Sequence, residues 1–577
     1  MREPMHDRER APRRPRRWLP ITSIAVASSL ALLAGACGTG SGDGADGGLP
    51  PGSIPNELEA EETPVTGGKL VVAVPAETNG WNPSINQWAD AGAMVASSIV
   101  EPLVVLDKEG NVEMFLAESV TPVNEDFTQW DIKVKPGIEF HNGQKLDAAA
   151  VKENLEATFL TGLTSIAMGP MYDRVEITNP ADTVRVYLKK TWAQYPQGLA
   201  SGAGWMLAHE QLTHENDQGE VDGGVLHPIG TGPFVFQEWR QNDSFKATKF
   251  DKYWRKAEDG TQLPYLDEIE FRPIVDDAGK EQALGSGDVD MIYTTSAEVA
   301  SRMSDSFEVI RDYNSERTFV MLNTAVGDLN EGNPFTNVHA RRALAYATDR
   351  AQIADLVGTG VQITTQGYRP DSQWHVAEGN EGYYSYDPAK AKEEIDLYKA
   401  DTGAESLSFT LSGLTNLEDS TLMQALQAQW KDAGIDARID QIDQVKYIST
   451  IALGGFQAAW FRWYGNPDPD ANYVFNAAET AKGVGGVNIN FTQYTSPEMQ
   501  ANLEKGRTTQ DPKERKILND KVVKEINEQA LAIWLFDTPY SLISDPQVRG
   551  LNDFRTRPFG NFLPKPYWGD VWIKPEG

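Results

Sequence analysis

The only cysteine of the 577-residue chain, Cys37, directly follows an uncharged run of residues 18–36, and an arginine-rich segment, residues 13–17, precedes that run. A basic segment, an apolar segment and the small residues Ala34 and Ala36 together are typical of a secretory signal. We therefore expect residues 1–36 to be removed on export. Because no other cysteine remains, disulfides cannot brace the exported protein, and a hydrophobic core must hold its fold.

Cys37 is expected to become the first residue of the exported protein and to carry a lipid. The site resembles a bacterial lipoprotein lipobox, although Leu33 lies four residues before the cysteine and Ala34 takes the usual leucine position. Acyl chains on the cysteine would partition into the bilayer at about 0.8 kcal/mol per buried methylene. The alternative is ordinary cleavage after Ala36, which leaves a free thiol on a secreted or periplasmic protein. Export could use the general secretory route or, through Arg16 and Arg17, the twin-arginine route.

Acidic residues dominate the charge of the chain, with 83 Asp and Glu against 52 Lys and Arg and a formal net charge of −31. Such a field repels phosphate backbones and anionic lipid surfaces, so nucleic acid is not an expected partner. No second run of 18 or more apolar residues follows the signal, which leaves the lipid as the expected membrane attachment.

Order is expected to begin at residue 69. Residues 38–68 are rich in Gly, Ser, Pro and acids and contain no Lys or Arg, which predicts a disordered, self-repelling tether. From 69–74 onward, β-branched runs of strand length alternate with helical patterns. One example is a helix that stops at Gly434 and leads into a strand over 435–442. The pattern predicts a mixed α/β protein of more than one domain.

The common catalytic and metal-binding patterns are absent from the sequence. It has no G-x-S-x-G elbow and no phosphate-binding loop, and His209 and His214 are five residues apart. Five residues turn a helix by about 500°, so these two rings would not share the face that a zinc-binding H-E-x-x-H pair needs. We therefore expect no enzyme, no metal and no cofactor.

Short motifs follow one another in order along the chain, at residues 80–83, 99–103, 116–119, 134–143, 228–234, 265–269, 283–290, 338–350, 429–435 and 532–536. In this order they resemble the family 5 extracellular solute-binding proteins, the peptide, opine and nickel receptors of ABC importers. The resemblance covers about residues 69–570. Most of these motifs are expected to be scaffold.

The resemblance implies a periplasmic-binding-protein-like fold of two α/β lobes with a hinge and an inserted third subdomain. The implied ranges are 37–68 for the lipid-anchored linker, 69–105, 223–321 and 537–577 for the first lobe, 106–222 for the insert, and 322–536 for the second lobe. Solute would lie between the lobes and favour a closed form that the permease recognises. The implied partners are a small-molecule or peptide solute, an ABC permease with its ATPase, and the membrane through the lipid; the protein is expected to be a monomer.

Segment 459–470 aligns with the pocket strand and loop of the second lobe in this family. The expected ligand-binding residues are Trp460, Arg462, Trp463, Tyr464, Asn466 and Asp468 in this segment, together with Trp88 in the first lobe and Tyr368 in a second-lobe loop. Peptide-binding relatives carry an aspartate where this chain has Gly465, so a peptide amino terminus would need Asp468 instead. Arg462 could pair with a carboxylate or phosphate, and the aromatic residues could stack on a ligand. Alternatively, Trp460 and Arg462 face one way and their neighbours the core.

The expected function is therefore capture of an oligopeptide-like solute for an ABC importer. The same receptor class could instead serve an oligosaccharide, an opine-like conjugate or a metal chelate. A secreted hydrolase, and an adhesin or chaperone on the same fold, are the remaining alternatives.

Overall fold

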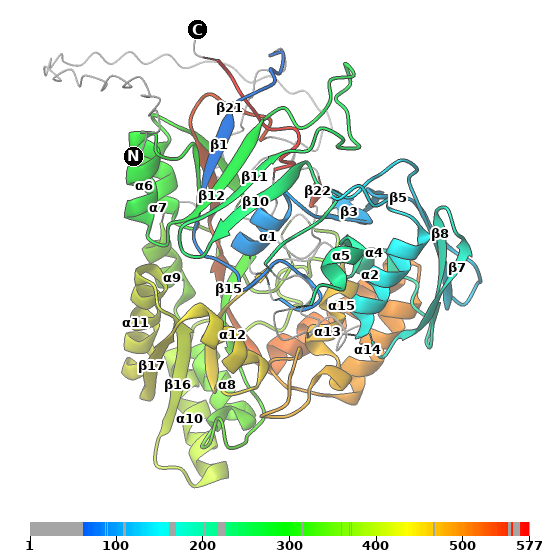
Figure 1. The fold of residues 1–577 in the computed structure, drawn as a ribbon. Helices are drawn as coiled ribbons and strands as arrows, with labels where there is room; N and C mark the ends of the chain where they lie inside the picture. Colours follow the sequence, from blue (N-terminus) through cyan, green and yellow to red (C-terminus); the bar gives the residue numbers. More distant parts are fainter. Residues whose placement is uncertain are drawn as a thin grey trace, which may run out of the picture. The chain divides into compact units, whose positions relative to one another are not determined.

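The computed structural model describes residues 62–86, 88, 90–107, 111–160, 169–200, 202–215, 226–312, 316–358, 361–368, 370, 372–464, 468–551, 556–557 and 566–575. The predicted signal, Cys37 and most of the predicted tether lie outside the described residues. Within them, no helix combines the length and the apolar character needed to cross a membrane. The elements alternate between helices and strands (Figure 1), which confirms the predicted α/β class.

The first lobe is built on a seven-stranded sheet with the order β10-β11-β12-β1-β13-β20-β14. Its strands are β1 (Lys69–Val74), β10 (Phe234–Arg240), β11 (Ser244–Lys249), β12 (Glu268–Pro273), β13 (Met291–Thr294), β14 (Glu308–Asp312) and β20 (Tyr540–Ser544). The central strand β1 is parallel to β12 and β13 and is buried after its first residue. A continuous apolar run suits this place, because both faces of such a strand are covered.

Helices cover the two faces of this sheet (Figure 1). Leu70, Val72 and Val74 pack in the core that includes α1 (Asp90–Ala96), whereas Val71 and Ala73 pack with α6 (Asp277–Ser286) and α7 (Ala297–Met303) on the other face. The alternation of side chains along a strand therefore places α1 on one side of the sheet and α6 and α7 on the other.

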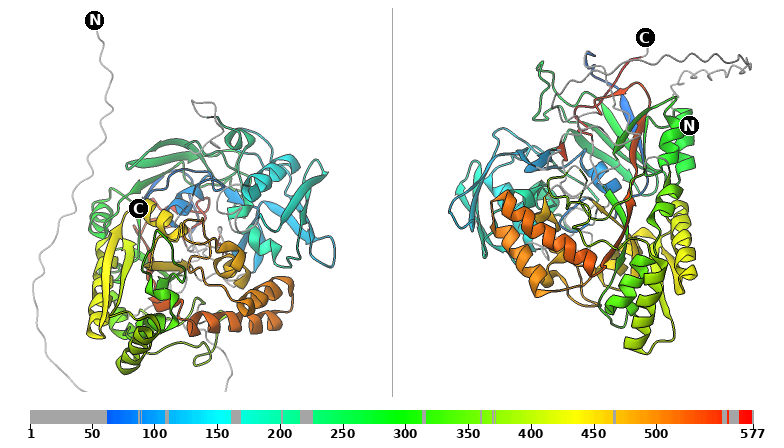
Figure 2. Two further views of the ribbon diagram at one scale, coloured as in Figure 1. Left: turned by 90° about the horizontal axis from the view of Figure 1, so that it is seen from below. Right: turned by 180° about the vertical axis from the view of Figure 1, so that it is seen from behind.

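The second lobe is built on a five-stranded sheet with the order β17-β16-β18-β15-β19. Its strands are β15 (Glu316–Leu322), β16 (Leu407–Leu414), β17 (Ile435–Ile442), β18 (Ala458–Tyr464) and β19 (Ala532–Asp537). One face packs against α8 (Val338–Tyr346), α9 (Arg350–Val357), α10 (Pro388–Thr402) and α11 (Leu417–Asp432). The other face meets α12 (Gln444–Ala452) and α15 (Pro512–Glu528), and α14 (Pro497–Thr508) lies beside α15 (Figure 2).

The predicted boundary between the lobes falls at residues 321 and 322, inside β15. In the structure β15 pairs along its length with β18 and along most of it with β19, so the whole strand belongs to the second-lobe sheet. The chain crosses between the lobe sheets after β14, several residues earlier than predicted. An apolar strand gives no sign in its own sequence of which sheet it will join.

The inserted part carries a four-stranded antiparallel sheet with the order β5-β6-β8-β7. These strands are β5 (Ala117–Pro122), β6 (Gln129–Val134), β7 (Tyr172–Asn179) and β8 (Thr183–Leu188), and α2 (Ala148–Leu160) packs against them. A tight turn joins β7 and β8, with Asn179 opposite Thr183. Burial alternates along β6 and β8, as a sheet with one covered face requires.

Shorter elements complete the described chain. The small ladders are β2 (Glu101–Pro102) with β9 (Trp205–Met206), β3 (Val104–Asp107) with β4 (Val112–Met114) and β22 (Thr556–Arg557), and β21 (Val548–Arg549) with β23 (Trp572–Ile573). The short helices are α4 (Tyr195–Leu199), α5 (His209–Leu212), α13 (Tyr473–Asn476), η1 (Gly202–Gly204), η2 (Pro334–Thr336), η3 (Pro469–Asn472) and η4 (Ala478–Thr480).

The chain passes between the lobe sheets from β14 to β15 and from β19 to β20, and the start of β15 pairs with the end of β19. Arg317 and Asp537 form an ion pair of 3.2 Å there, and both side chains are buried. The hydroxyls of Thr318 and Thr538 are 2.7 Å apart, and the amide of Thr538 donates to the carbonyl oxygen of Glu316. The hinge region is thus tied together by a buried charge pair and hydrogen bonds.

Candidate solute-binding site

Four charged side chains from both lobes lie beside these crossings, and we call them the interlobe charge cluster: Asp90, Glu316, Asp419 and Arg462. Asp90 is the first residue of α1, Glu316 the first of β15, Asp419 lies in the first turn of α11, and Arg462 is on β18. The three acidic residues are buried. Glu316 interacts electrostatically with each of the other three.

Asp419 is held in place by its own helix and by β18. Asn416 caps α11, and its side chain both accepts from the Asp419 amide and donates to Asp419 Oδ2. Trp460 Nε1 donates to Asp419 Oδ1 at 2.9 Å, and Arg462 Nη2 donates to the same oxygen at 3.0 Å. Trp460 and Arg462 therefore share one face of β18, as alternation along a strand requires.

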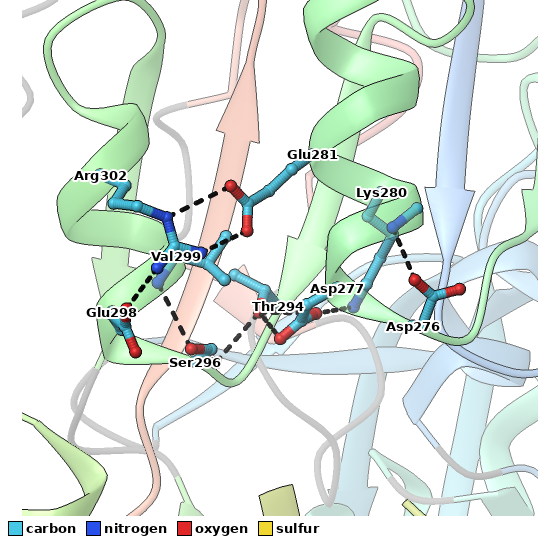
Figure 3. A network of polar contacts seen from close by, with 10 residues as sticks. Asp276, Asp277, Lys280, Glu281, Thr294, Ser296, Glu298, Val299 and Arg302 are labelled. Atoms are coloured by element: carbon cyan, nitrogen blue, oxygen red, sulfur yellow. Dashed lines mark hydrogen bonds and ion pairs between the residues drawn. The ribbon is translucent and has the colours of Figure 1, made fainter. Parts of the chain in front are cut away.

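Arg462 also reaches the first lobe, where its Nη1 lies 3.5 Å from Thr295 Oγ1. Figure 3 shows the polar network that holds the loop after β13, which carries Thr295. Thr294 donates to Asp277, Asp277 pairs with Lys280 at 2.5 Å, and the amide of Ser296 donates to Thr294 Oγ1. Because Lys280 also donates to the carbonyl of Tyr293, this loop is fixed on both sides of Thr294.

Burial raises the pKa of Glu316 to about 7; the nearby carboxylates of Asp90 and Asp419 act in the same direction, and Arg462 and a hydrogen bond from Thr538 oppose them. Its Oε2 has no hydrogen-bond partner among the described residues. The three acidic groups outnumber the one guanidinium, so the cluster attracts another positive charge. A protonated amino group would supply both that charge and a donor for Oε2.

Two predicted ligand-binding residues lie elsewhere in the lobes. Trp88 precedes α1, donates its indole N–H to the carbonyl of Gly80, and packs against Trp205 with ring centroids 4.4 Å apart. Tyr368 is buried in the second lobe, where its hydroxyl donates to Asn519 and accepts from Asn472. Neither side chain contacts the interlobe charge cluster through a described hydrogen bond, and their ligand roles stay predictions.

Asp468 is buried and forms a two-pronged ion pair with Arg515, at 2.9 Å from Nη1 and 2.5 Å from Nη2. It also caps η3 by accepting from the amide of Asp470. With both oxygens in use, Asp468 does not stand free to replace the aspartate missing at Gly465.

The remaining predicted residues are only partly described. The backbones of Trp463 and Tyr464 pair with Arg317 and Glu316, so both residues lie at the hinge end of β18. Their side chains, and the whole of Asn466, lie outside the described residues. Trp460 itself is 2% exposed and packs in the second-lobe core. Sequence reasoning singled out Arg462 but missed Asp90, Glu316 and Asp419, because no single acid stands out in a chain with 83 of them.

Among the described residues, no group of three or more His, Cys, Asp or Glu side chains is placed to hold a metal ion. Two lobes, paired crossings and a charged site between the lobes together define a two-lobed solute receptor.

The model of the bacterial extracellular solute-binding proteins, family 5, middle, matches residues 111–484 of this chain. The chain belongs to this family, whose members are the solute-binding receptors of ABC importers. It is 26% identical over 430 residues to the glutathione-binding protein GsiB of Salmonella paratyphi A, covering 73% of this chain and 80% of the relative. With GsiB of Pectobacterium atrosepticum it is 26% identical over 465 residues, covering 78% and 84%.

Solved structures of similar fold include proteins with different ligands. The oligopeptide-binding protein AppA of Bacillus subtilis, in complex with a nonapeptide, has a TM-score of 0.75 at 21% identity, covering 89% of this chain and 100% of AppA. AgaA from A. tumefaciens R10 with agropinic acid has a TM-score of 0.74 at 21% identity, covering 88% and 99%. NikZ of Campylobacter jejuni with Ni(L-His) has a TM-score of 0.71 at 19% identity, covering 87% and 97%. These likenesses confirm the two-lobe fold.

Proposed function

We propose that this receptor captures an oligopeptide-like solute between its lobes, binds the solute's protonated amino group at the interlobe charge cluster, and delivers it to the permease of an ABC importer. The observation that carries the proposal is Glu316, a buried acid beside the hinge with two further acids nearby and one oxygen without a described partner.

An ammonium group fits this cluster for electrostatic reasons. Taking a carboxylate out of water is costly unless a partner compensates its charge, and Arg462 is one cation among three acids. An ammonium near Glu316 would favour the ionised carboxylate and donate to Oε2. The amino terminus of a peptide is such an ammonium group. The aspartate with which peptide-binding relatives bind it is replaced in this chain by Gly465.

Binding would act on the equilibrium between open and closed arrangements of the lobes. Asp90 belongs to the first lobe and Asp419 and Arg462 to the second, so a solute at the cluster contacts both lobes only when they are close. A ligand shifts such an equilibrium by its difference in affinity for the two forms. The closed form is the one that the permease would recognise.

The receptor is proposed to work as a monomer without catalytic activity, exported by its signal and held at the membrane by a lipid on Cys37. An attached receptor keeps captured solute close to its permease, because tethering raises the effective concentration. The three-part division of the chain, with an insert in the first lobe, belongs to the same proposal.

An opine-like conjugate is the second candidate solute. It is supported by the replacement of the relatives' aspartate with Gly465 and by the fold that this chain shares with AgaA. Such a conjugate also carries an amine nitrogen beside carboxylates, so Glu316 and Arg462 could serve it as well.

Native mass spectrometry of protein purified from its own host identifies the retained solute. A titration of tryptophan fluorescence with a peptide library then measures affinity, with the exposed Glu113→Gln as control and Glu316→Gln as the test variant. The proposal is supported if the retained solute is a peptide that wild type and control bind equally well. Glu316→Gln should bind this peptide at least tenfold more weakly. A retained non-peptide, or a library without any binder, contradicts it.

A further inference from the structure

The interlobe charge cluster brings three acidic side chains and one basic side chain together from the two lobes. Asp90 belongs to the first lobe, and Glu316, Asp419 and Arg462 belong to the second. Closing the lobes therefore moves one acid of the first lobe towards two acids of the second. Like charges that meet away from water repel each other strongly. Closure is thus favoured by any further positive charge at the cluster.

The other ionisable groups that face Glu316 do not supply this charge. Arg317, its neighbour on β15, is paired with Asp537 at the end of β19. Tyr293 of β13 interacts electrostatically with Glu316, and burial raises the pKa of Tyr293 well above its usual value, so its hydroxyl stays neutral. The charge must come from the solute or from a proton.

Glu316 is the acid of the cluster that is best placed to take up a proton. Asp419 accepts hydrogen bonds from both Trp460 and Arg462, whereas Oε2 of Glu316 has no partner among the described residues. Glu316 is only 3% exposed, and burial together with the nearby carboxylates raises its pKa to about 7. Because Oε2 is sealed from solvent in this arrangement of the lobes, a proton fits there where a solute group does not.

Opening of the lobes would reverse these conditions. Asp90 and Tyr293 would move away with the first lobe, and water would reach the Glu316 carboxyl. A glutamate in water has a pKa of about 4.3. Between about pH 4.5 and pH 7 the closed form then binds a proton that the open form has released, and the form that binds more protons gains population as pH falls.

We propose that a proton on Glu316 takes the place of the solute's positive charge, so that the receptor closes without solute in acid medium and captures solute less well there. This inference rests on the proposed binding of an amino group at the same cluster. The proton and an ammonium group exclude each other, because a protonated carboxyl no longer attracts a cation. A receptor that has closed without solute must reopen before it binds, which lowers its apparent affinity.

The test measures the ratio of closed to open receptor without solute at pH 5 and at pH 7.5. Spin labels on Val275→Cys of the first lobe and Ile517→Cys of the second, both exposed positions, report the distance between the lobes by double electron–electron resonance. The full chain carries Cys37→Ser, so that only these two sites are labelled. The closed-to-open ratio should rise at least tenfold from pH 7.5 to pH 5.

Three variants assign the effect to Glu316. Glu316→Gln, which has nearly the same shape and cannot ionise, should give the same ratio at both pH values. The exposed Glu113→Gln should behave as wild type. Asp90→Asn should keep a pH-dependent ratio with a lower midpoint, because it removes one of the charges that raise the pKa of Glu316. Far-UV circular dichroism checks the fold of each protein at each pH.

A ratio that does not change with pH in the wild type, or that changes as much in Glu316→Gln, would overturn the inference. If Glu316→Gln does not fold, Asp90→Asn decides, and a midpoint that stays at the wild-type value would overturn it. These failures are distinct from failure of the proposed function, because the ratio is measured without solute. The proposed function fails when no peptide binds at pH 7.5.

Discussion

Trp192 donates its indole N–H to Oδ2 of Asp470 at 2.7 Å, which joins the inserted part of the chain to the second lobe. Arg507 donates to the other oxygen of Asp470 at 2.8 Å, and its guanidinium lies over the Trp192 ring. The amide of Ala193 donates to the carbonyl of Arg507. Figure 2 shows the insert next to α14 and α15. This contact would have to break whenever the second lobe moves away from the insert.

Trp192→Phe should therefore weaken solute binding and speed solute release, because it removes a hydrogen bond to a charged group. Such a bond contributes about 1.5–3 kcal/mol, which corresponds to a loss of affinity of about tenfold or more. Stopped-flow fluorescence measures the release rate. Trp130→Phe is the matched control, since Trp130 donates to Phe127 within the insert. Equal release rates in Trp192→Phe and wild type would rule out a contribution of this contact to closure.

Glu316 should make stability depend on pH. The pKa of a glutamate in an unfolded chain is about 4.3, and burial raises that of Glu316 to about 7 in the folded protein. The folded protein thus keeps a proton that the unfolded chain has released, so stability falls as pH rises from about 4.5 to about 7 and stays lowered above that.

Glu316→Gln removes this dependence. As pH rises from 4.5 to 7.5, the free energy of unfolding of Glu316→Gln should increase relative to that of wild type by up to about 3 kcal/mol. Urea unfolding at a series of pH values measures the difference, and the exposed Glu113→Gln should show no such change. A difference between Glu316→Gln and wild type that is flat across this range would contradict the raised pKa.

The elements of the fold were predictable because they depend on local pattern. The apolar run Lys69–Val74 and the strand Ile435–Ile442 occur as the sequence indicates. Gly230 lies in a motif that was expected to be scaffold, and the structure supplies the reason: a Cβ there would lie 2.0 Å from the carbonyl oxygen of Ile99. Such a close approach between distant segments cannot be derived from one sequence.

The site was less predictable because it depends on which distant residues meet. Aromatic richness singled out Trp460, yet β18 is a central strand covered on both faces, and the Trp460 indole is bonded to Asp419. Glu316, Asp90 and Asp419 come from three separate elements of two lobes. Their meeting depends on the crossing between the sheets, which the sequence alone placed several residues too late.

Breaking the buried hinge pair should destabilise the protein strongly. Arg317→Met leaves Asp537 buried without that ion-pair partner, and removal of one member of a buried pair costs about 3–5 kcal/mol. The double variant Arg317→Met with Asp537→Leu should recover most of the loss, because no uncompensated charge remains. Urea unfolding curves of the three proteins measure this. A loss below about 1 kcal/mol in the single variant would show that the pair does not stabilise the hinge.

Cys37→Ser should move the protein from the membrane fraction into the culture medium, because the lipid is the expected attachment. Cell fractionation and immunoblotting measure the distribution, with Ser41→Ala in the predicted tether as control. If Cys37→Ser partitions as wild type does, the protein is not anchored at this residue, and the receptor function is unaffected by that result.

The most direct test of the account measures whether Glu316 recognises the amino group of the solute. Calorimetry gives the affinity of wild type and of Glu316→Gln for one bound peptide, with its amino terminus either free or acetylated. We predict that acetylation weakens binding to wild type at least tenfold, or about 1.4 kcal/mol, and weakens binding to Glu316→Gln by less than about threefold. The same loss on acetylation in both proteins would show that Glu316 does not bind the amino group.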